Sequence, residues 1–159
     1  MRRQFGKTVL DLARQDQRIV VCFGDVFQNL EAYRDEFPDR LFNMGITEQA
    51  SIAMCAGMAA SGLRPIYYTL TLFALERAFE FIKLDVDEMK LPVIIVTYAS
   101  YPSHGPTQTQ LPFWKNVQPF KNIPLIFPTD SDDADRSIRM LHHENRGGVI
   151  CLTKDEAVK

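Results

Sequence analysis

The sequence lacks the short motifs by which many nucleotide-binding and hydrolytic enzymes are recognised. No GxGxxG follows the first apolar run, no GxxxxGK[ST] occurs anywhere, and GxSxG and HExxH are absent as well. These absences exclude the common phosphate-binding loops, a serine nucleophile on a strand-to-helix turn, and a helical zinc-protease site. If the protein uses a phosphorylated cofactor, it does not hold the phosphates by these devices.

Cysteine is scarce, and its positions exclude two further kinds of site. Cys22, Cys55 and Cys151 lie far apart and are odd in number, which excludes a disulfide framework. No CxxC occurs, and no cysteine and histidine pair has the spacing of metal ligands. We expect reduced cysteines in the core and no metal site in this chain.

The sequence also lacks an excess of basic charge and any long apolar run. Eighteen Lys and Arg residues against twenty Asp and Glu residues leave a formal net charge of −2. That charge argues against a nucleic acid or an anionic membrane as a partner. The N-terminus alternates polar and apolar residues, unlike a signal peptide, and no segment is long enough to cross a bilayer. We expect a cytoplasmic protein with no nucleic-acid or membrane partner.

What the sequence does contain is a regular alternation of short apolar runs and helical patterns. The runs are apolar without strict alternation, as expected for parallel strands covered on both faces. This order predicts a three-layer α/β/α, doubly wound fold with a mostly parallel sheet, in a single domain over residues 1–159. The predicted strands are 18–24, 41–44, 64–70, 92–98, 123–128 and 148–153, and the predicted helices are 5–16, 47–62 (capped by Thr47), 75–89 and 131–145.

Polar residues near the predicted strand ends supply the candidate site. Asp25 follows the first strand, where open parallel sheets bind ligands, although aspartate is also a common turn residue. Glu48 enters an apolar helix, where a buried charge is costly unless it is paired or used, although a first-turn glutamate also interacts with the helix dipole. The irregular segment 99–122, which contains His104 and Gln108, is of a length that is usually functional or disordered. Its apolar composition favours a functional loop.

Three blocks of sequence, taken together, resemble the pyrimidine-binding domain of the transketolase family. They are "GITEQASIAMCAGMAASGLRP" at 45–65, "KLPVIIVT" at 90–97 and "HGPTQTQ" at 104–110. That family includes transketolase, deoxyxylulose phosphate synthase and the beta subunits of 2-oxoacid dehydrogenases. The likeness runs from about Phe5 to Lys154, and it implies the pyrimidine domain of the thiamine diphosphate-binding fold.

The resemblance implies a specific use for Glu48. The matching glutamate hydrogen-bonds the N1′ nitrogen of thiamine diphosphate's aminopyrimidine and promotes the imino tautomer. The neighbouring nitrogen then takes the proton from the thiazolium carbon, and the resulting carbanion attacks a ketose or a 2-oxoacid. Such a carboxylate works best in a dry pocket, which accounts for a charge beside so many small apolar residues.

The resemblance also implies which residues hold the rest of the aminopyrimidine. Asp25 matches an aspartate near the cofactor, and Ile46 belongs to the block around the glutamate. Phe73 is the best match for the aromatic residue that stacks on the pyrimidine ring. The match shifts by about a residue in this segment, so Tyr68 and Phe79 are the alternatives.

Two departures from the transketolase pattern concern the substrate. The family's usual GPTH reads GPTQ here and ends in Gln108, and a further histidine has no counterpart in the shorter segment before it. His104 is the candidate for the missing acid–base function, and Lys154 is at best the match for an arginine that helps hold sugar phosphate. We expect His104 and Gln108 to face a small carbonyl or sugar substrate unlike the usual pentose phosphates.

The family's diphosphate and Mg²⁺ site rests on a Gly-Asp-Gly followed by an asparagine, and no Gly-Asp-Gly occurs in this sequence. We therefore expect a separate diphosphate-binding subunit to hold the Mg²⁺ and the diphosphate of a shared thiamine diphosphate, with two copies of each chain. The helices at 47–61 and 72–89 are the expected interface. The hypothesis is one subunit of a split, transketolase-like transferase that moves a two-carbon ketol or acyl unit between small carbonyl compounds.

Two alternatives stay open. The first is a subunit of a deoxyxylulose phosphate synthase-like or other 2-oxoacid-decarboxylating enzyme, because "GLRP" and "KLPV" resemble that branch closely. The second is a non-catalytic regulatory or assembly subunit that has kept the fold. The intact Glu48 argues against the second alternative, since a silent copy has no use for a buried carboxylate.

Overall fold

A six-stranded, all-parallel sheet forms the centre of the computed structural model, which describes residues 1–25, 27–99, 105 and 118–153. The strand order is β2-β1-β3-β4-β6-β5. All six strands expected from the sequence are present, and the predicted parallel sheet is confirmed. Their bounds are β1 (Ile19–Phe23), β2 (Leu41–Asn43), β3 (Arg64–Leu70), β4 (Ile94–Tyr98), β5 (Leu125–Ile126) and β6 (Gly148–Leu152).

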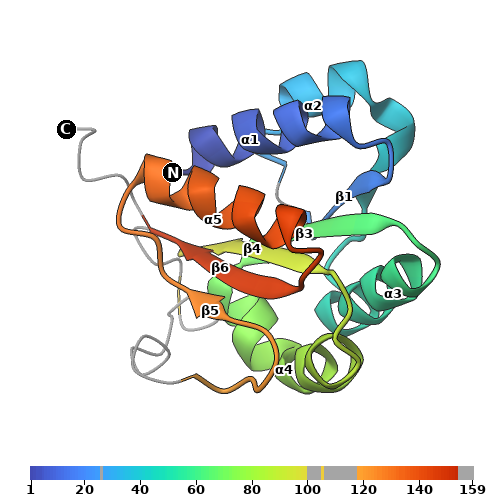
Figure 1. The fold of residues 1–159 in the computed structure, drawn as a ribbon, viewed down its shortest axis with the longest axis vertical. Helices are drawn as coiled ribbons and strands as arrows, with labels where there is room; N and C mark the ends of the chain where they lie inside the picture. The colour runs from blue at the N-terminus through green and yellow to red at the C-terminus, as the bar shows by residue number, and fades with distance from the viewer. Residues whose placement is uncertain (26, 100–104, 106–117, 154–159) are drawn as a thin grey trace.

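Helices cover both faces of the sheet, which confirms the three-layer α/β/α fold (Figure 1). One face carries α1 (Arg2–Gln15), α2 (Glu31–Glu36) and α5 (Ser131–His143), and the other carries α3 (Glu48–Ala60) and the segment around α4 (Phe79–Phe81). The remaining short elements are the 3₁₀ turn η1 (Pro38–Arg40) and the π-helical segments η2 (Phe73–Arg77) and η3 (Ile82–Glu88).

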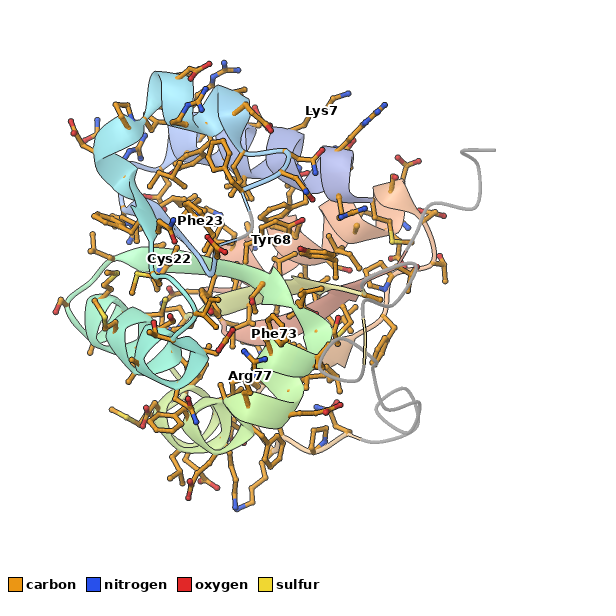
Figure 2. All side chains as sticks on the ribbon, turned by 180° about the vertical axis from the view of Figure 1, so that it is seen from behind. Lys7, Cys22, Phe23, Tyr68, Phe73 and Arg77 are labelled. Atoms are coloured by element: carbon orange, nitrogen blue, oxygen red, sulfur yellow. The ribbon has the colours of Figure 1, made fainter. Side chains whose placement is uncertain are left out.

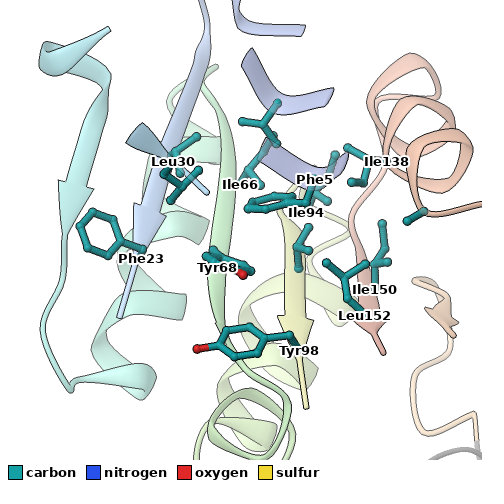
Figure 3. Packing of buried hydrophobic residues seen from close by; sticks show 14 of the residues in the cluster. Phe5, Phe23, Leu30, Ile66, Tyr68, Ile94, Tyr98, Ile138, Ile150 and Leu152 are labelled. Carbon is teal, nitrogen blue, oxygen red and sulfur yellow. The ribbon is translucent and has the colours of Figure 1, made fainter. Parts of the chain in front are cut away.

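The sheet separates two hydrophobic cores, because successive strand residues point to opposite faces. On the α1 and α5 side, Tyr68 lies between Phe5 and Tyr98, with ring centroids 4.5 Å and 5.3 Å away (Figure 3). Tyr67, its neighbour on β3, belongs to the core on the α3 side. That second core also contains Cys22, Ile52, Cys55, Leu75, Ile82, Val86, Ile95 and Val149.

The strand order brings three connecting loops to one edge of the sheet. β1 lies between β2 and β3, with Phe23 in register with Asn43 on one side and Tyr68 on the other. Since all the strands are parallel, their carboxyl ends share this edge, and the order of the strands changes direction at β1. Ligands of open α/β sheets bind in the crevice at such a point.

The segment after β3 differs from the regular helix predicted over 75–89. Helical geometry already begins four residues earlier, at Thr71, and the segment winds as π turns on both sides of α4. Ala78, with φ −112° and ψ 16°, interrupts the helical backbone between η2 and α4. Single π turns inside helices are frequent at functional sites. Within the described ranges, no helix is both long enough and apolar enough to cross a membrane.

Candidate functional site

Glu48 opens α3 directly after a tight turn that follows β2. Gly45 adopts φ +66°, a conformation that glycine takes without a Cβ clash, and its N–H donates to Asn43 Oδ1 at 2.9 Å. Thr47 occupies the N-cap position, as expected, but its hydroxyl donates back to the carbonyl of Met44 at 2.6 Å instead of capping the helix. The turn thus determines where α3 begins, and with it the position of Glu48.

The carboxylate of Glu48 is buried, and it is paired. The residue is 2% exposed. Nη1 of Arg77 donates to both carboxylate oxygens of Glu48 at 3.2 Å. The side chain of Arg77 remains 36% exposed. A buried charge without such a partner would be strongly destabilising. The contact with Arg77 therefore explains how a buried carboxylate can occupy the first position of α3.

Arg77 also stacks on an aromatic ring from its own π turn. Its guanidinium carbon lies 3.8 Å from the ring centroid of Phe73, a half-buried residue four positions earlier. Figure 2 shows both residues on the segment that follows β3. Arginine favours such stacking, because its delocalised charge is attracted to the face of the ring. Glu48, Arg77 and Phe73 therefore form one continuous set of contacts at the carboxyl edge of the sheet.

Buried hydroxyl groups lie beneath this edge. Tyr67 and Thr69 are fully buried, and neither hydroxyl reaches hydrogen-bond geometry with a described partner, although Tyr67 lies close to Ser51 and Thr69. A Cβ added at Gly24 would come within 3.0 Å of the Tyr67 hydroxyl and 3.3 Å of the Gly45 carbonyl, so β1 packs tightly against the turn before Glu48. Burial raises the pKa of Tyr67 to about 12, which keeps its hydroxyl neutral.

The structure places the other two expected cofactor residues at the same edge, without tying them to Glu48. Asp25 is exposed directly after β1 and adopts φ 59°, which is uncommon for a residue other than glycine. Ile46 is 68% exposed, two residues before Glu48. Across the described residues, no hydrogen bond or ion pair joins Asp25 to Glu48.

Of the three aromatic candidates, Phe73 is the one whose ring contacts the Glu48 partner. Tyr68 is 0% exposed and lies in the core on the opposite face of the sheet. Phe79 stacks on Phe120, with ring centroids 5.5 Å apart. These positions favour Phe73 as the aromatic residue of the site.

The expected substrate residues His104 and Gln108 lie outside the described residues, as does Lys154. In the part of the chain that the structure describes, no group of three or more His, Cys, Asp or Glu side chains could hold a metal ion. His142 is placed far from the site, on α5, where its Nε2 lies 3.1 Å from a carboxylate oxygen of Asp16.

Arg77 is the site residue that the sequence reasoning missed. Two signals were available: a buried Glu48 requires a cationic partner, and Arg77 follows Phe73 at the spacing that brings helical side chains together. Neither signal selects Arg77 over the other basic residues, because the pair is separated by 29 positions and depends on how two segments pack.

The chain is similar to known proteins in sequence and in fold. The family profile described as "Transketolase, pyrimidine binding domain" matches residues 1–158. A 1-deoxy-D-xylulose-5-phosphate synthase of Clostridium perfringens is 39% identical over 158 aligned positions, covering 92% of this chain and 25% of that protein. An uncharacterised transketolase family protein of Sinorhizobium fredii is 32% identical over 142 positions, covering 84% of this chain and 40% of that protein. The chain thus spans between a quarter and two fifths of these two relatives.

Two solved structures share the fold. One is described as "Split gene transketolase, inactive beta4 tetramer"; it has a TM-score of 0.85 and 25% identity, covering 99% of this chain and 52% of that one. A transketolase from Campylobacter jejuni gives a TM-score of 0.84 at 17% identity, covering 96% of this chain and 25% of that one.

Proposed function

Because this chain belongs to the transketolase family as a pyrimidine-binding domain, we propose that it forms the pyrimidine half of a thiamine diphosphate site in a two-chain transferase. The observation that carries this proposal is the buried carboxylate of Glu48, which Arg77 links to the ring of Phe73. The family is thiamine diphosphate-dependent, and these are the two side-chain types that an aminopyrimidine ring needs.

The residues at the edge of the sheet fit an aminopyrimidine. The buried Glu48 can exchange a proton with a ring nitrogen, because water does not compete for its oxygens. Phe73 offers a flat aromatic face, and Ile46, two residues before Glu48, offers exposed apolar surface. We assign Asp25, two residues after β1, as a polar residue near the ring. When bound, thiamine diphosphate supplies the reactive carbon for two-carbon transfer.

The diphosphate and its Mg²⁺ are assigned to a separate subunit. The sequence has no Gly-Asp-Gly to bind them, and a solved relative of this chain is described as a split-gene transketolase. The cofactor would then lie between two polypeptides, and neither chain would bind it well alone. We assign two copies of each chain to the active assembly.

The outer face of α3 is the surface we assign to this interface. The helix is apolar on all sides, yet only part of it is covered by the sheet; Met54 is 52% exposed, and Gly57 has open space around it. A helix that is apolar all round is normally buried. Phe42 on β2 is also 40% exposed, and we assign it to the same interface.

The reaction assigned to the assembly is transfer of a two-carbon ketol or acyl unit between small carbonyl compounds, with His104 and Gln108 facing the substrate. The second candidate is decarboxylative condensation of a 2-oxoacid, which the 39% identity to deoxyxylulose phosphate synthase favours. Release of CO₂ from pyruvate by the assembled enzyme separates the two reactions.

The compartment we assign is the cytoplasm. Cys22, Cys55 and Cys151 are free thiols, and all three are buried in the core on the α3 side of the sheet. Free thiols of this kind suit a reducing compartment.

The test is reconstitution with a candidate diphosphate-binding subunit, followed by a titration of thiamine diphosphate and Mg²⁺ by calorimetry. Saturable binding by the mixture, and by neither chain alone, is the expected result. Saturable binding by this chain alone would contradict the division between two subunits. A mixture that forms a complex but binds no cofactor would contradict the proposed function itself.

A further inference from the structure

Arg77 makes two contacts that together outline a slot. Its guanidinium donates to both oxygens of Glu48 at 3.2 Å, and its carbon lies 3.8 Å from the centroid of Phe73. The group that fills the slot is flat, carries N–H donors and positive charge, and is stacked on an aromatic face. The slot is therefore suited to any planar nitrogen-containing cation or donor of similar thickness.

An aminopyrimidine ring has the same features as this guanidinium. It is planar, it presents ring and amino nitrogens along one edge, and it stacks on aromatic side chains. Nη1 of Arg77 already engages both oxygens of Glu48, and the guanidinium covers one face of Phe73. A ring that bonds Glu48 through a nitrogen and stacks on that same face therefore competes with the guanidinium for both contacts.

The two partners of the ion pair differ in their freedom to leave it. The Glu48 side chain is 3% exposed, whereas the Arg77 side chain is 36% exposed. Arg77 can therefore turn its charge into water, while Glu48 cannot. The carboxylate would be left buried without a partner, so departure of the arginine is favourable only when another donor replaces it.

The backbone around Arg77 is also irregular. Arg77 ends the π turn η2, and Ala78 directly after it has φ −112° and ψ 16°, outside the helical region. The side chain thus projects from a break between two helical pieces, at the open edge of the sheet. A long, flexible side chain at such a position can change its direction without disturbing either core.

We propose that Arg77 is a replaceable plug of the Glu48–Phe73 slot: in the free chain its guanidinium occupies the place of an aminopyrimidine ring, and the incoming ring exchanges with it. The identity of that ring rests on the proposed function, whereas the existence of the slot does not. Only chains with an open slot bind the ring. The apparent dissociation constant therefore equals the intrinsic one divided by the fraction of chains in which the slot is open.

The first test uses the 159-residue chain alone, with 4-aminopyrimidine as the probe. Binding is followed by ligand-observed NMR and by thermal unfolding, in the wild type, Arg77→Ala and Arg77→Ala/Glu48→Gln. We expect Arg77→Ala to bind the probe at least about tenfold more tightly than the wild type. At about five times its dissociation constant, the probe should raise the Tm of Arg77→Ala by roughly 2–4 °C.

Controls separate the slot from general effects of charge. Methylguanidinium should compete with 4-aminopyrimidine in Arg77→Ala, whereas tetramethylammonium, which has no planar N–H donors, should not. The double variant should lose the gain in affinity. If Arg77→Ala does not fold, Arg77→Lys, which keeps the charge but not the planar guanidinium, should bind the probe with intermediate affinity. Equal or tighter binding by the wild type, or no binding by a folded variant, would overturn the plug.

The second test uses the complex with the diphosphate-binding subunit and measures the Kd of thiamine diphosphate. We expect Arg77→Ala to bind it about tenfold more tightly than the wild type. Weaker binding by Arg77→Ala would show that Arg77 holds the cofactor, and it would overturn the plug while leaving the proposed function intact. If the wild-type complex binds no cofactor, the proposed function fails, and the test on the isolated chain still decides whether the slot is plugged.

Discussion

Asp87 and Asn122 are joined by two hydrogen bonds that connect the end of η3 to the segment before β5. The backbone N–H of Asn122 donates to Asp87 Oδ1 at 2.7 Å, and its side-chain amide donates to the Asp87 carbonyl at 3.0 Å. The carboxylate of Asp87 also accepts the N–H groups of Lys121 and Ile123, each at 2.9 Å. One buried side chain thus organises the backbone that leads into the edge strand.

The first prediction concerns Asp87→Asn. Burial opposes ionisation of Asp87, but the backbone N–H groups of Lys121, Asn122 and Ile123 outweigh it and lower the pKa of the carboxyl below its ordinary value. The substitution places an NH₂ group against those donors, so we expect a loss of about 2–4 kcal/mol of unfolding free energy at pH 7. Urea denaturation followed by circular dichroism measures it.

The pH dependence of the same pair has a definite sign. A carboxyl whose pKa is lower in the folded chain stabilises it fully above the unfolded pKa, about 4, and loses this contribution as the pH falls through the folded value. The difference in stability between wild type and Asp87→Asn should therefore shrink below about pH 4. Asp85→Asn, on the same helical segment, is the matched control. A difference that stays constant down to pH 2 would contradict this account of Asp87.

The second prediction concerns Glu48→Gln, which keeps the shape of the side chain and removes its charge. Proton exchange with a ring nitrogen requires a carboxyl group, so turnover by the assembled enzyme should fall about 10²–10⁴-fold. The fold should persist, because Arg77 is one-third exposed and can turn to water. Steady-state kinetics and analytical ultracentrifugation measure the two quantities. An unchanged rate in an active complex would remove Glu48 from the mechanism; Glu80→Gln is the exposed control.

The third prediction concerns the outer face of α3. Gly57 is exposed, and a Cβ added there would meet nothing within 4 Å. Gly57→Ala should therefore stabilise the isolated chain by about 0.5–1 kcal/mol, as alanine does for glycine inside helices. Gly57→Leu should leave the isolated chain folded but weaken assembly with the diphosphate-binding subunit by at least about tenfold, since interface cores tolerate overpacking poorly. Surface plasmon resonance measures the affinity of Gly57→Leu and of the wild type for the diphosphate-binding subunit. Equal affinities would place the interface elsewhere.

The fourth prediction concerns Gly6, where α1 meets the backbone of Asn29. A Cβ added at Gly6 would lie 2.0 Å from the Asn29 carbonyl oxygen, which no side-chain rotation can relieve. We expect Gly6→Ala to lower the unfolding free energy by about 1–3 kcal/mol, whereas Gly57→Ala, also within a helix, raises it. Thermal unfolding of the two variants gives the comparison. Gly6→Ala with wild-type stability would mean that α1 and this loop are not held as closely as the structure shows.

The strands were predictable because each is a short apolar run between helical patterns. The predicted strand 123–128 was too long, because β5 comprises only Leu125–Ile126. Pro124 and Pro128 flank it, and proline has no N–H to donate to a neighbouring strand. The helix α2 was missed because it has six residues and buries only Tyr33, so it leaves no apolar stripe in the sequence.

The site was predictable only in part. The apolar surroundings of Glu48 indicated that its charge had to be paired or used, and the structure shows that it is paired. The partner, Arg77, depends on the packing of η2 against α3, which no local pattern reports. The π turn that presents Phe73 and Arg77 is equally invisible in the sequence, because it differs from a regular helix only in its hydrogen-bond spacing. The roles of Asp25 and Ile46 stay predictions.

Tyr67 and Tyr68, side by side on β3 and facing opposite cores, give the chain a built-in pair of reporters. Each ring is completely buried, so its environment changes only when the layer on its side opens. Fluorinated tyrosine at these two positions would yield two NMR signals, one for each half of the molecule. If both signals change together during unfolding, the two layers form a single cooperative unit; if they separate, the α3 side can loosen on its own.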